Sequence, residues 1–400
     1  MNTQTIQSDY LIIGAGIIGL TIARELRERQ PDKKIIIIEK ESDVALHSSG
    51  RNSGVLHAGF YYTADSLKAK FTREGNSAMR NYCKSNGLHI NECKKVVVAR
   101  NAAELPALHE LNRRAQSNGV NVQLINLKEL AEIEPNAVSY RQALLSPTTA
   151  TVDPVEVNLC LKNELLAKGI EFYFNDAYIE RIGGNTVKTE KHVFSATKLI
   201  NTAGLYADRV AQNFGFSKNF TIIPFKGIYL KYTGDKQLIN TNIYPVPNLK
   251  NPFLGVHYTV TVDNHIKIGP TSIPAFWREN YQGISNFHVK ELVNILSWEA
   301  LLFLLNSFGF RNLAIDEVKK YSRKYFVALA QAMVKEMDAE RFTEWVRPGI
   351  RAQLLNKTTK ELVMDFVVEG DADSVHVLNA VSPAFTCSFP FAKWVVENYV

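Results

Sequence analysis

Three glycines, Gly14, Gly16 and Gly19, follow a short apolar run and open a helical pattern, and Glu39 ends a second apolar run twenty residues later. The first glycine permits a tight strand-to-helix turn, the second lets backbone N–H groups approach a pyrophosphate, and the third allows close packing of the helix on the strand. An acid at the end of the second strand accepts hydrogen bonds from an adenosine ribose and repels a 2′-phosphate. These features in this order predict a dinucleotide site that excludes NADP.

The helix that begins after Gly16 should present free N–H groups and the positive end of its dipole to the phosphates. A single glycine fingerprint suits both an NAD enzyme and a flavoprotein whose substrate itself delivers the electrons. The segment 47–62 favours flavin, because it carries small hydrogen-bond donors, glycines and a histidine just beyond the second strand, where an extended cofactor would continue. The alternative is a structural loop of the same composition.

These residues must be positioned by a βαβ unit, for which the sequence predicts a strand at 10–14, a helix at 17–30 and a strand at 35–39. An alternating apolar pattern within 222–269 predicts an antiparallel sheet. The other helices are expected at 107–117, 127–134, 155–167, 206–214, 288–304, 321–337 and after Pro383, and the other strands at 96–98, 170–174, 198–201, 362–368 and 375–378.

Composition restricts the function classes further. The chain has 400 residues, 46% of them hydrophobic and 22% charged, which is typical of a globular protein with more than one domain. Its net charge of +6 is modest, and lysines and arginines do not form a block interleaved with aromatic residues. We therefore expect no nucleic-acid partner. A mildly basic surface is equally compatible with acidic metabolites and with an anionic membrane face.

The cysteines and the N-terminal residues indicate the cellular compartment in which we expect the protein. The polar residues 1–9 lead directly into the first expected strand, and no run of eighteen apolar residues occurs, so we expect neither a presequence nor a membrane span. We expect a cytoplasmic protein, for which peripheral contact with the inner face of a membrane stays open. The cysteines show no metal-ligand spacing, which predicts structural thiols, a reducing compartment and no metal site; they are Cys83, Cys93, Cys160 and Cys387.

Beyond the glycines, the segment Asn52-Ser53-Gly54-Val55-Leu56-His57-Ala58-Gly59 resembles the most distinctive stretch of the FAD-dependent oxidoreductases of the D-amino-acid oxidase and glycine oxidase type. Arg51, Lys226, Val381 and Phe385 depart from the family's usual residues. Other similar segments follow in the family's order over nearly the whole chain, among them Val152-Asp153-Pro154, Thr202-Ala203-Gly204, Pro252-Phe253-Leu254-Gly255-Val256-His257, Gly349-Ile350-Arg351 and Ser382-Pro383-Ala384.

This resemblance implies an α/β fold: a Rossmann-type FAD-binding domain with an interleaved antiparallel-sheet α+β substrate domain. We expect a discontinuous FAD-binding domain made of residues 1–90, 145–220 and 345–400, and a substrate domain made of residues 91–144 and 221–344. The similarity is strongest to the subgroup that acts on L-2-hydroxyglutarate. It implies oxidation of that small 2-hydroxy acid, or a related one, to 2-oxoglutarate by hydride transfer to flavin, with oxygen or a quinone as electron acceptor.

Two other functions stay open: an amino-acid or amine oxidase of the same fold, and a flavin-binding protein without turnover. Oxidation of a 2-hydroxy acid needs a carboxylate held in place and a base for the hydroxyl proton. The resemblance assigns the carboxylate to Arg351, with Arg347 as a weaker candidate, because the rigid guanidinium fork donates two parallel hydrogen bonds. A histidine suits the base, and His257 is the candidate. His57 is expected to contact the flavin, with a covalent flavin link as the alternative.

The predicted site residues fall into three sets. The catalytic set is His257, Arg351 and His57, and the substrate-binding set is Tyr61, Lys226, Tyr229, His257 and Arg351. The cofactor-binding set is Gly14, Gly16, Ile17, Ile18, Gly19, Glu39, Lys40, Ser49, Asn52, Ser53, Gly54, His57, Val97, Ala203, Gly204, Arg351, Ser382, Pro383 and Ala384.

Overall fold

The structure is a computed structural model, and it describes residues 4–234, 238–248 and 254–400. Pro252 and Phe253, which belong to one of the family-like segments, lie outside the described residues. The chain forms two compact units. The first consists of Met1–Asn52, Pro154–Pro224 and Arg351–Val400, and the second of Ser53–Asp153 and Phe225–Ile350. Each unit is therefore assembled from segments that are distant in sequence.

The first unit is built on an eight-stranded sheet. Its centre is the predicted βαβ unit, in which β1 (Thr5–Ile13) pairs in parallel with β2 (Ile35–Ile38), and α1 (Ile17–Arg29) connects them. The four isoleucines of β2 are all buried, as expected for a parallel strand covered on both faces. The path runs β10-β11-β12-β1-β2-β9, and β23 pairs with both β12 and β22.

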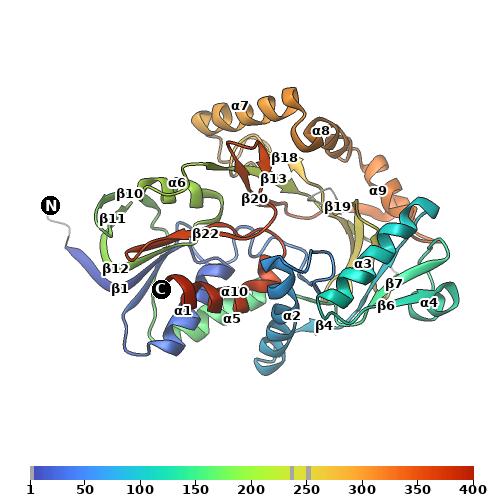
Figure 1. Cartoon of the computed structure of the whole chain (residues 1–400), viewed down its shortest axis with the longest axis horizontal. Helices are drawn as coiled ribbons and strands as arrows, with labels where there is room; N and C mark the ends of the chain where they lie inside the picture. The colour runs from blue at the N-terminus through green and yellow to red at the C-terminus, as the bar shows by residue number, and fades with distance from the viewer. Residues whose placement is uncertain (1–3, 235–237, 249–253) are drawn as a thin grey trace. The chain divides into compact units, whose positions relative to one another are not determined.

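The remaining elements of the first unit support this sheet. Helix α1 contacts both α5 and α10, which Figure 1 shows beside it, whereas α6 contacts β10, β12 and β23. The bounds are α5 Pro154–Ala167, β9 Glu171–Tyr173, β10 Tyr178–Gly183, β11 Thr186–Thr189, β12 Val193–Asn201, α6 Ala207–Asn213, β21 Glu361–Leu362, β22 Val367–Gly370, β23 Ser374–Asn379 and α10 Ala384–Tyr399.

The second unit contains another eight-stranded sheet, of order β19-β14-β17-β16-β15-β5-β7-β6. Its pairs are antiparallel except for β15 with β5, so the expectation of an antiparallel sheet in this region is confirmed. The bounds are β5 Lys95–Val98, β6 Gln123–Asn126, β7 Gln142–Ser146, β14 Leu230–Tyr232, β15 Asn242–Pro245, β16 His257–Val260, β17 Ile266–Gly269 and β19 Phe342–Trp345.

Side chains alternate between the two faces of this sheet. One face is apolar: Val96, Ile243 and Tyr258 belong to a buried cluster that also contains Phe326 of α9 (Arg323–Gln331). The opposite face carries the alternate residues of the same strands, among them Lys95, Tyr244 and His257. The residues that could do chemistry in this unit therefore lie on a rigid sheet whose other face forms a core.

The other elements of the second unit include a small sheet of order β3-β8-β4 and a pairing of β13 with β18. The bounds are β3 Val55–Leu56, α2 Leu67–Ser85, β4 Ile90–Asn91, α3 Leu105–Ser117, α4 Leu127–Ile133, β8 Ala150–Val152, β18 Ile273–Pro274, α7 Val289–Leu305 and α8 Phe310–Lys319. Two strands contain residues of both units, because the chain passes from one unit to the other within them: β13 spans Phe220–Gly227 and β20 spans Gly349–Asn356.

The structure differs from the expected domain limits mainly over residues 53–90, which belong by their contacts to the second unit. The reason is local pairing. Strand β3 pairs with β8, and the Asn76 side chain of α2 donates hydrogen bonds to the carbonyl groups of Leu56, His57 and Thr148. The same pairing brings residues 145–153 into the second unit. Smaller differences place residues 221–224 in the first unit and residues 345–350 in the second.

Several element predictions were wrong. Helices α2 and α8 were not expected, the helix expected at 321–337 spans only Arg323–Gln331, and the strand expected at 362–368 is divided into β21 and β22. Asn306 ends α7 in the left-handed conformation, with a φ of 51°, and α8 begins after Gly309, with a φ of 76°. This turn explains why one apolar stretch forms two helices.

Candidate active site

The glycine turn of the first unit has no room for side chains. Gly14 has a φ of 102°, and a Cβ atom there would lie 2.7 Å from the carbonyl oxygen of Thr202. A Cβ atom on Gly19 would lie 2.1 Å from the carbonyl oxygen of Gly14. Both glycines are therefore required by close backbone approach, as the sequence predicts. Gly16 is less restricted, because its Cβ atom would meet only the Ser49 hydroxyl, at 3.1 Å.

The Glu39 carboxylate accepts hydrogen bonds from two backbone groups, one of which belongs to the glycine turn. Its Oε2 atom accepts a hydrogen bond from Ala15 N at 2.8 Å, and its Oε1 atom accepts one from Glu41 N at 3.0 Å. The sequence predicted a ribose acceptor here but not this structural contact. A carboxylate offers about four acceptor positions, so these two bonds leave capacity for ribose hydroxyls.

The N-terminus of α1 lacks the usual capping side chain. Gly16 offers none, and the first turn contains no acidic residue. Ile17 N donates instead to the Ser49 hydroxyl at 2.9 Å. The Ser49 carbonyl in turn accepts hydrogen bonds from the side chains of Asn52, at 2.8 Å, and Asn158, at 3.3 Å. The first turn of α1 therefore carries no acidic side chain of its own, which suits an anionic diphosphate.

Two further predicted segments are also well fixed in the first unit. The Thr202 hydroxyl donates to the carbonyl groups of Ile13 and Gly14, both at 3.0 Å, so the turn that contains Ala203 and Gly204 lies against the glycine turn. Strand β23 ends at Asn379 and α10 begins at Ala384, as predicted for the terminal segment. Ser382 and Pro383 precede that helix, which has no side-chain cap.

In the second unit, His257 has a defined tautomer. Its Nδ1 atom lies 2.8 Å from the carbonyl oxygen of Gly255, which can only accept, so Nδ1 carries the hydrogen. In the neutral ring Nε2 is then the nitrogen that can accept a hydrogen bond or a proton. The ring is buried and stacks on that of Tyr244, with centroids 3.6 Å apart and an interplanar angle of 18°. His257 is thus held rigidly in a form that can take a proton.

His57 is buried in the same unit. Burial lowers the pKa of its imidazole well below the ordinary value, and the neighbouring Lys95 and His257 lower that pKa further. His57 is therefore neutral at physiological pH. The Asn76 side chain holds its carbonyl group from α2, at 3.2 Å. A neutral histidine donates one hydrogen bond from the ring nitrogen that carries the hydrogen and accepts one at the other ring nitrogen.

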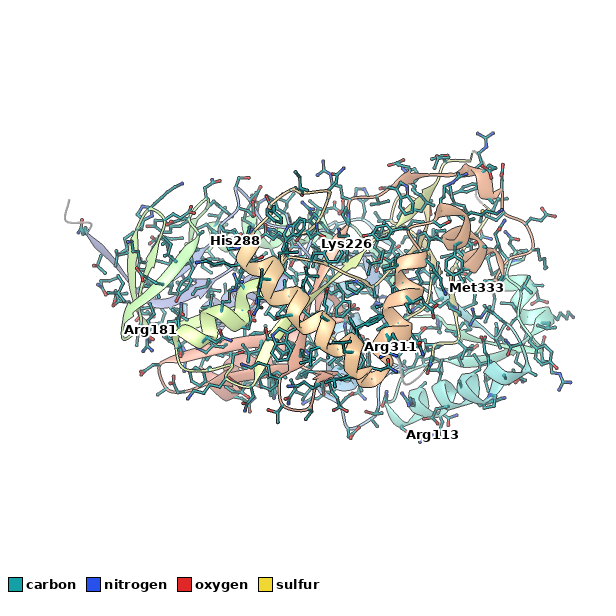
Figure 2. The ribbon with its side chains drawn as sticks, turned by 90° about the horizontal axis from the view of Figure 1, so that it is seen from above. Arg113, Arg181, Lys226, His288, Arg311 and Met333 are labelled. Atoms are coloured by element: carbon teal, nitrogen blue, oxygen red, sulfur yellow. The ribbon has the colours of Figure 1, made fainter. Side chains whose placement is uncertain are left out.

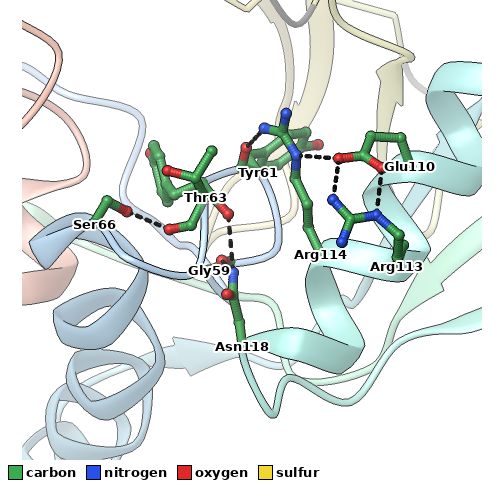
Figure 3. Close-up of polar contacts among 9 residues, drawn as sticks. Gly59, Tyr61, Thr63, Ser66, Glu110, Arg113, Arg114 and Asn118 are labelled. Atoms are coloured by element: carbon green, nitrogen blue, oxygen red, sulfur yellow. Dashed lines mark hydrogen bonds and ion pairs between the residues drawn. The ribbon is translucent and has the colours of Figure 1, made fainter.

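The segment after His57 is fixed by helix α3, as Figure 3 shows. The Asn118 side chain donates to the carbonyl groups of Gly59 and Tyr62, both at 3.0 Å. Arg114 donates to the Tyr61 carbonyl at 2.8 Å and pairs with Glu110 at 2.9 Å. Tyr61, a predicted substrate residue, is therefore placed by α3, a contact that its local sequence does not reveal.

The remaining predicted residues lie in different surroundings. Lys226 is buried and donates to Asn280 Oδ1 at 3.2 Å, and its pKa is lowered by burial. Tyr229 is buried, with its ring centroid 4.9 Å from Lys267 Nζ. In the first unit, Lys40 Nζ lies 2.8 Å from His47 Nε2, Ile18 is buried in α1, and Arg351 is partly buried in β20.

Besides His57, three other residues predicted to bind the cofactor lie in the second unit. Val97 is buried in an apolar cluster, Ser53 begins the unit, and the Gly54 carbonyl accepts a hydrogen bond from Val152 N at 2.9 Å. The weaker carboxylate candidate, Arg347, is exposed and precedes β20.

Sequence analysis missed Lys95, the first residue of β5, whose side chain is completely buried next to Tyr61 and Tyr244. The signal was present, because this lysine begins the run Lys95-Val96-Val97-Val98, in which every residue is buried. A charged residue in a fully buried strand has to be neutralised or held by partners.

Comparison with known proteins agrees with this geometry. The model of the family described as FAD dependent oxidoreductase matches residues 9–398, and the chain belongs to this family. The L-2-hydroxyglutarate dehydrogenase of Escherichia coli (strain K12) is 33% identical over 396 residues, which cover 98% of this chain and 92% of that protein. The L-2-hydroxyglutarate dehydrogenase of Indibacter alkaliphilus is 34% identical over 393 residues, which cover 97% of each chain.

Solved structures show the same fold at lower identity. The L-alpha-glycerophosphate oxidase of Mycoplasma pneumoniae, with FAD bound, has a TM-score of 0.77 at 22% identity, and 98% of this chain and 95% of that chain are covered. The glycine oxidase of Geobacillus kaustophilus has a TM-score of 0.71 at 17% identity, with 98% and 94% covered. The cofactor is FAD, and the glycine turn, the free end of α1 and Glu39 fit its nucleotide.

We predict that Glu39→Ala weakens FAD binding by about tenfold to a hundredfold, because hydrogen bonds to a charged group contribute about 1.5–3 kcal/mol. The variant loses both the ribose acceptor and the anchor of Ala15 N. Asp32→Ala, which removes an exposed acid in the turn after α1, is the matched control. Reconstitution of apoprotein with FAD, followed by flavin fluorescence, gives the dissociation constant. Equal affinity in the Glu39 variant and the control would contradict this role.

Proposed function

We propose that the protein oxidises L-2-hydroxyglutarate, or a closely related 2-hydroxy acid, to the 2-oxo acid with FAD as hydride acceptor. Relatives that bear this activity in their names match over nearly their full length. The observation that carries the proposal is the tautomer of His257. A hydroxyl group must lose a proton when its carbon loses a hydride, and His257, with Nδ1 held by the Gly255 carbonyl, would take that proton at Nε2.

The proposed roles follow from side-chain chemistry. When bound, FAD supplies a ring that accepts the hydride from C2 of the substrate. His257 Nε2 takes the hydroxyl proton, and Arg351 holds the adjacent carboxylate through its guanidinium fork. The glycine turn, Glu39 and the N-terminus of α1 hold the cofactor's adenosine and diphosphate. Tyr61, Lys226 and Tyr229 remain candidates for contacts to the rest of the substrate.

An amino-acid or amine oxidase of the same fold is the alternative. An amine that binds in its neutral form needs no proton acceptor in the hydride step, whereas a hydroxyl generally does. A histidine held with its Nε2 side as the proton acceptor therefore favours the hydroxy acid. L-Glutamate is the informative comparison, because it differs from L-2-hydroxyglutarate only by an amino group in place of the hydroxyl.

We predict that L-2-hydroxyglutarate added without oxygen bleaches the flavin in a single turnover, and that L-glutamate does so at least about a hundredfold more slowly, since a site built for one polar group rejects another strongly. Stopped-flow absorbance of the holoenzyme measures both rates. Faster reduction by L-glutamate would establish the amine alternative. Failure of both substrates to bleach a fully loaded flavin would refute the proposal.

We predict that Arg351→Ala lowers kcat/KM for L-2-hydroxyglutarate by about thirtyfold to several thousandfold, which corresponds to about 2–5 kcal/mol for a buried charge left without its partner. Arg351→Lys should also be impaired, because lysine lacks the fork that fixes the carboxylate. Arg347→Ala is the matched control from the exposed segment before β20. Flavin content should stay constant in all three variants, and wild-type kcat/KM in Arg351→Ala would refute the assignment.

For the electron acceptor we propose a quinone reached from a membrane surface, and the support is an apolar face on α7. Val289, Val293, Leu296 and Leu304 are exposed, with 64% of Val293 and 73% of Leu304 accessible. Their spacing of three, four and eight residues places them along one side of the helix. Soluble monomers rarely expose a contiguous apolar patch of this kind without an interaction partner.

Charge on the same elements favours an anionic lipid surface. The two acids of α7, Glu291 and Glu299, are both buried, and burial raises the pKa of Glu299 to about 8, so it is protonated at pH 7. Lys290 is exposed at the start of α7, and Arg311 is the second residue of α8, where Figure 2 labels it. An apolar face with flanking cations is typical of peripheral membrane contact.

Among the described residues, no single helix is both long and apolar enough to cross a bilayer. One pair of consecutive helical segments in this part of the chain passes the test when the two are taken together: Val289–Leu305 and Ser307–Lys319, with a bend of 104° between them. The proposed contact therefore involves the exposed side of α7 and the turn after it, which would lie along the surface of the bilayer.

We predict that the wild-type holoenzyme sediments with vesicles of phosphatidylglycerol and phosphatidylcholine, and that Val293→Glu with Leu304→Glu abolishes this, because each charge would have to enter the apolar boundary. Ile182→Glu, at an isoleucine that is 58% exposed on β10, is the matched control. Flavin reduction by substrate should be unchanged in both. If the double variant instead converts a dimer to a monomer without altering vesicle binding, the face is a contact between copies and the proposal is wrong.

A further inference from the structure

Lys95 is the most deeply buried cation whose amine lacks a hydrogen bond. Its side chain is 0% exposed, and Nζ has no hydrogen-bond partner among the described residues. Other buried lysines are satisfied: Lys198 donates to two carbonyl groups and Lys320 pairs with Glu317. Burial lowers the pKa of Lys95 to about 7. Burying an amine without a hydrogen-bond partner costs free energy, and a purely structural role for Lys95 gives no reason for that cost.

Aromatic rings surround this amine. Lys95 Nζ lies 4.2 Å from the ring centroid of Tyr244, 5.3 Å from that of Tyr61 and 5.6 Å from that of Phe60. The hydroxyl groups of Tyr61 and Tyr244 are also buried without a hydrogen-bond partner in the described part of the chain. Three unpartnered polar atoms therefore belong to one cluster. Buried polar groups in folded proteins nearly always have partners, so a cluster of three suggests a ligand.

The strand register places this cluster beside the proposed base. Strand β15 lies between β5 and β16, so Lys95 and His257 reach Tyr244 from opposite neighbouring strands. His257 stacks on the Tyr244 ring at 3.6 Å. Lys267 of β17 is paired with Thr259, two residues along from His257, and therefore points to the same face of the sheet.

The ionisable side chains on this face are mainly basic. Lys95 and Lys267 are amines, His57 and His257 are imidazoles, and no carboxylate accepts a hydrogen bond from Lys95 Nζ. Burial lowers the pKa of Lys267, and the electrostatic attraction of Asp153 opposes this lowering. A group of basic side chains without a matching carboxylate is complementary to an anionic substrate.

We propose that Lys95, together with the Tyr61 and Tyr244 hydroxyls, forms the subsite for the second carboxylate of the substrate and so selects dicarboxylates over monocarboxylates. The inference rests on the proposed function, since it concerns the same substrate. The two hydroxyls donate to the carboxylate oxygens, and Lys95 supplies the compensating charge behind the Tyr244 ring. Arg351 would then be needed only for the carboxylate next to the reacting carbon.

The test compares L-2-hydroxyglutarate with L-2-hydroxypentanoate, which has the same main chain but lacks the second carboxylate. In the wild type, kcat/KM should favour the dicarboxylate. Lys95→Met should reduce this preference by about tenfold to a hundredfold, because the second carboxylate loses its compensating charge, and leave the rate with L-2-hydroxypentanoate nearly unchanged. Lys94→Met, at the exposed neighbour, is the matched control and should keep the wild-type preference.

A second readout separates recognition from structure. Methionine has a similar volume and no charge, so Lys95→Met should leave the melting temperature unchanged or raise it. Tyr61→Phe and Tyr244→Phe should lower the preference in the same direction, which keeps the test available if the methionine variant does not fold. An equal loss with both substrates would overturn the subsite. If wild-type flavin is not reduced by L-2-hydroxyglutarate at all, the proposed function fails instead.

Discussion

The close backbone approach between Gly14 and Thr202 is the constraint on which the cofactor site depends. Two stretches of chain separated by almost two hundred residues meet there, with the Thr202 hydroxyl donating to the Gly14 carbonyl at 3.0 Å. Gly19 is packed over the same carbonyl. A side chain at either glycine would separate α1 from the turn, and the N–H groups of α1 would no longer face a bound diphosphate. The parallel pairing of β1 with β12 keeps the two stretches in register.

The second unit obeys a different constraint, which is the alternation of side chains along its strands. Burial of Val96, Ile243 and Tyr258 on one face forces Lys95, Tyr244 and His257 onto the other. A shift of one residue in register would exchange the core with the polar cluster. The apolar core therefore also determines the positions of the groups proposed to do chemistry. Burial has a cost there: it lowers the pKa of Lys95 to about 7, because the charged amine is less well solvated than in water.

Sequence alone predicted the elements whose signals are local. The βαβ unit was predicted to within a few residues because strand, glycines and helix are contiguous. Helix α2 was missed, although Ser66 caps it by accepting a hydrogen bond from Ala69 N and its buried residues recur at helical spacing. The contact of Glu39 with Ala15 N and the clamping of Tyr61 by Arg114 join residues distant in sequence. No local pattern contains such information.

The family and the solved structures establish FAD as the cofactor, whereas the substrate has to be inferred from the side chains of this chain. Enzymes that share this fold at 22% and 17% identity carry the names of a glycerophosphate oxidase and a glycine oxidase. A shared dinucleotide fold serves each of them, so the fold alone does not determine the substrate. Substrate choice must come from groups that differ in charge and hydrogen-bonding capacity. In this chain the groups proposed for that choice are His257, whose Nδ1 atom is held by the Gly255 carbonyl, and a buried amine next to two unpartnered hydroxyls, and this combination would suit a hydroxy acid with a second negative charge.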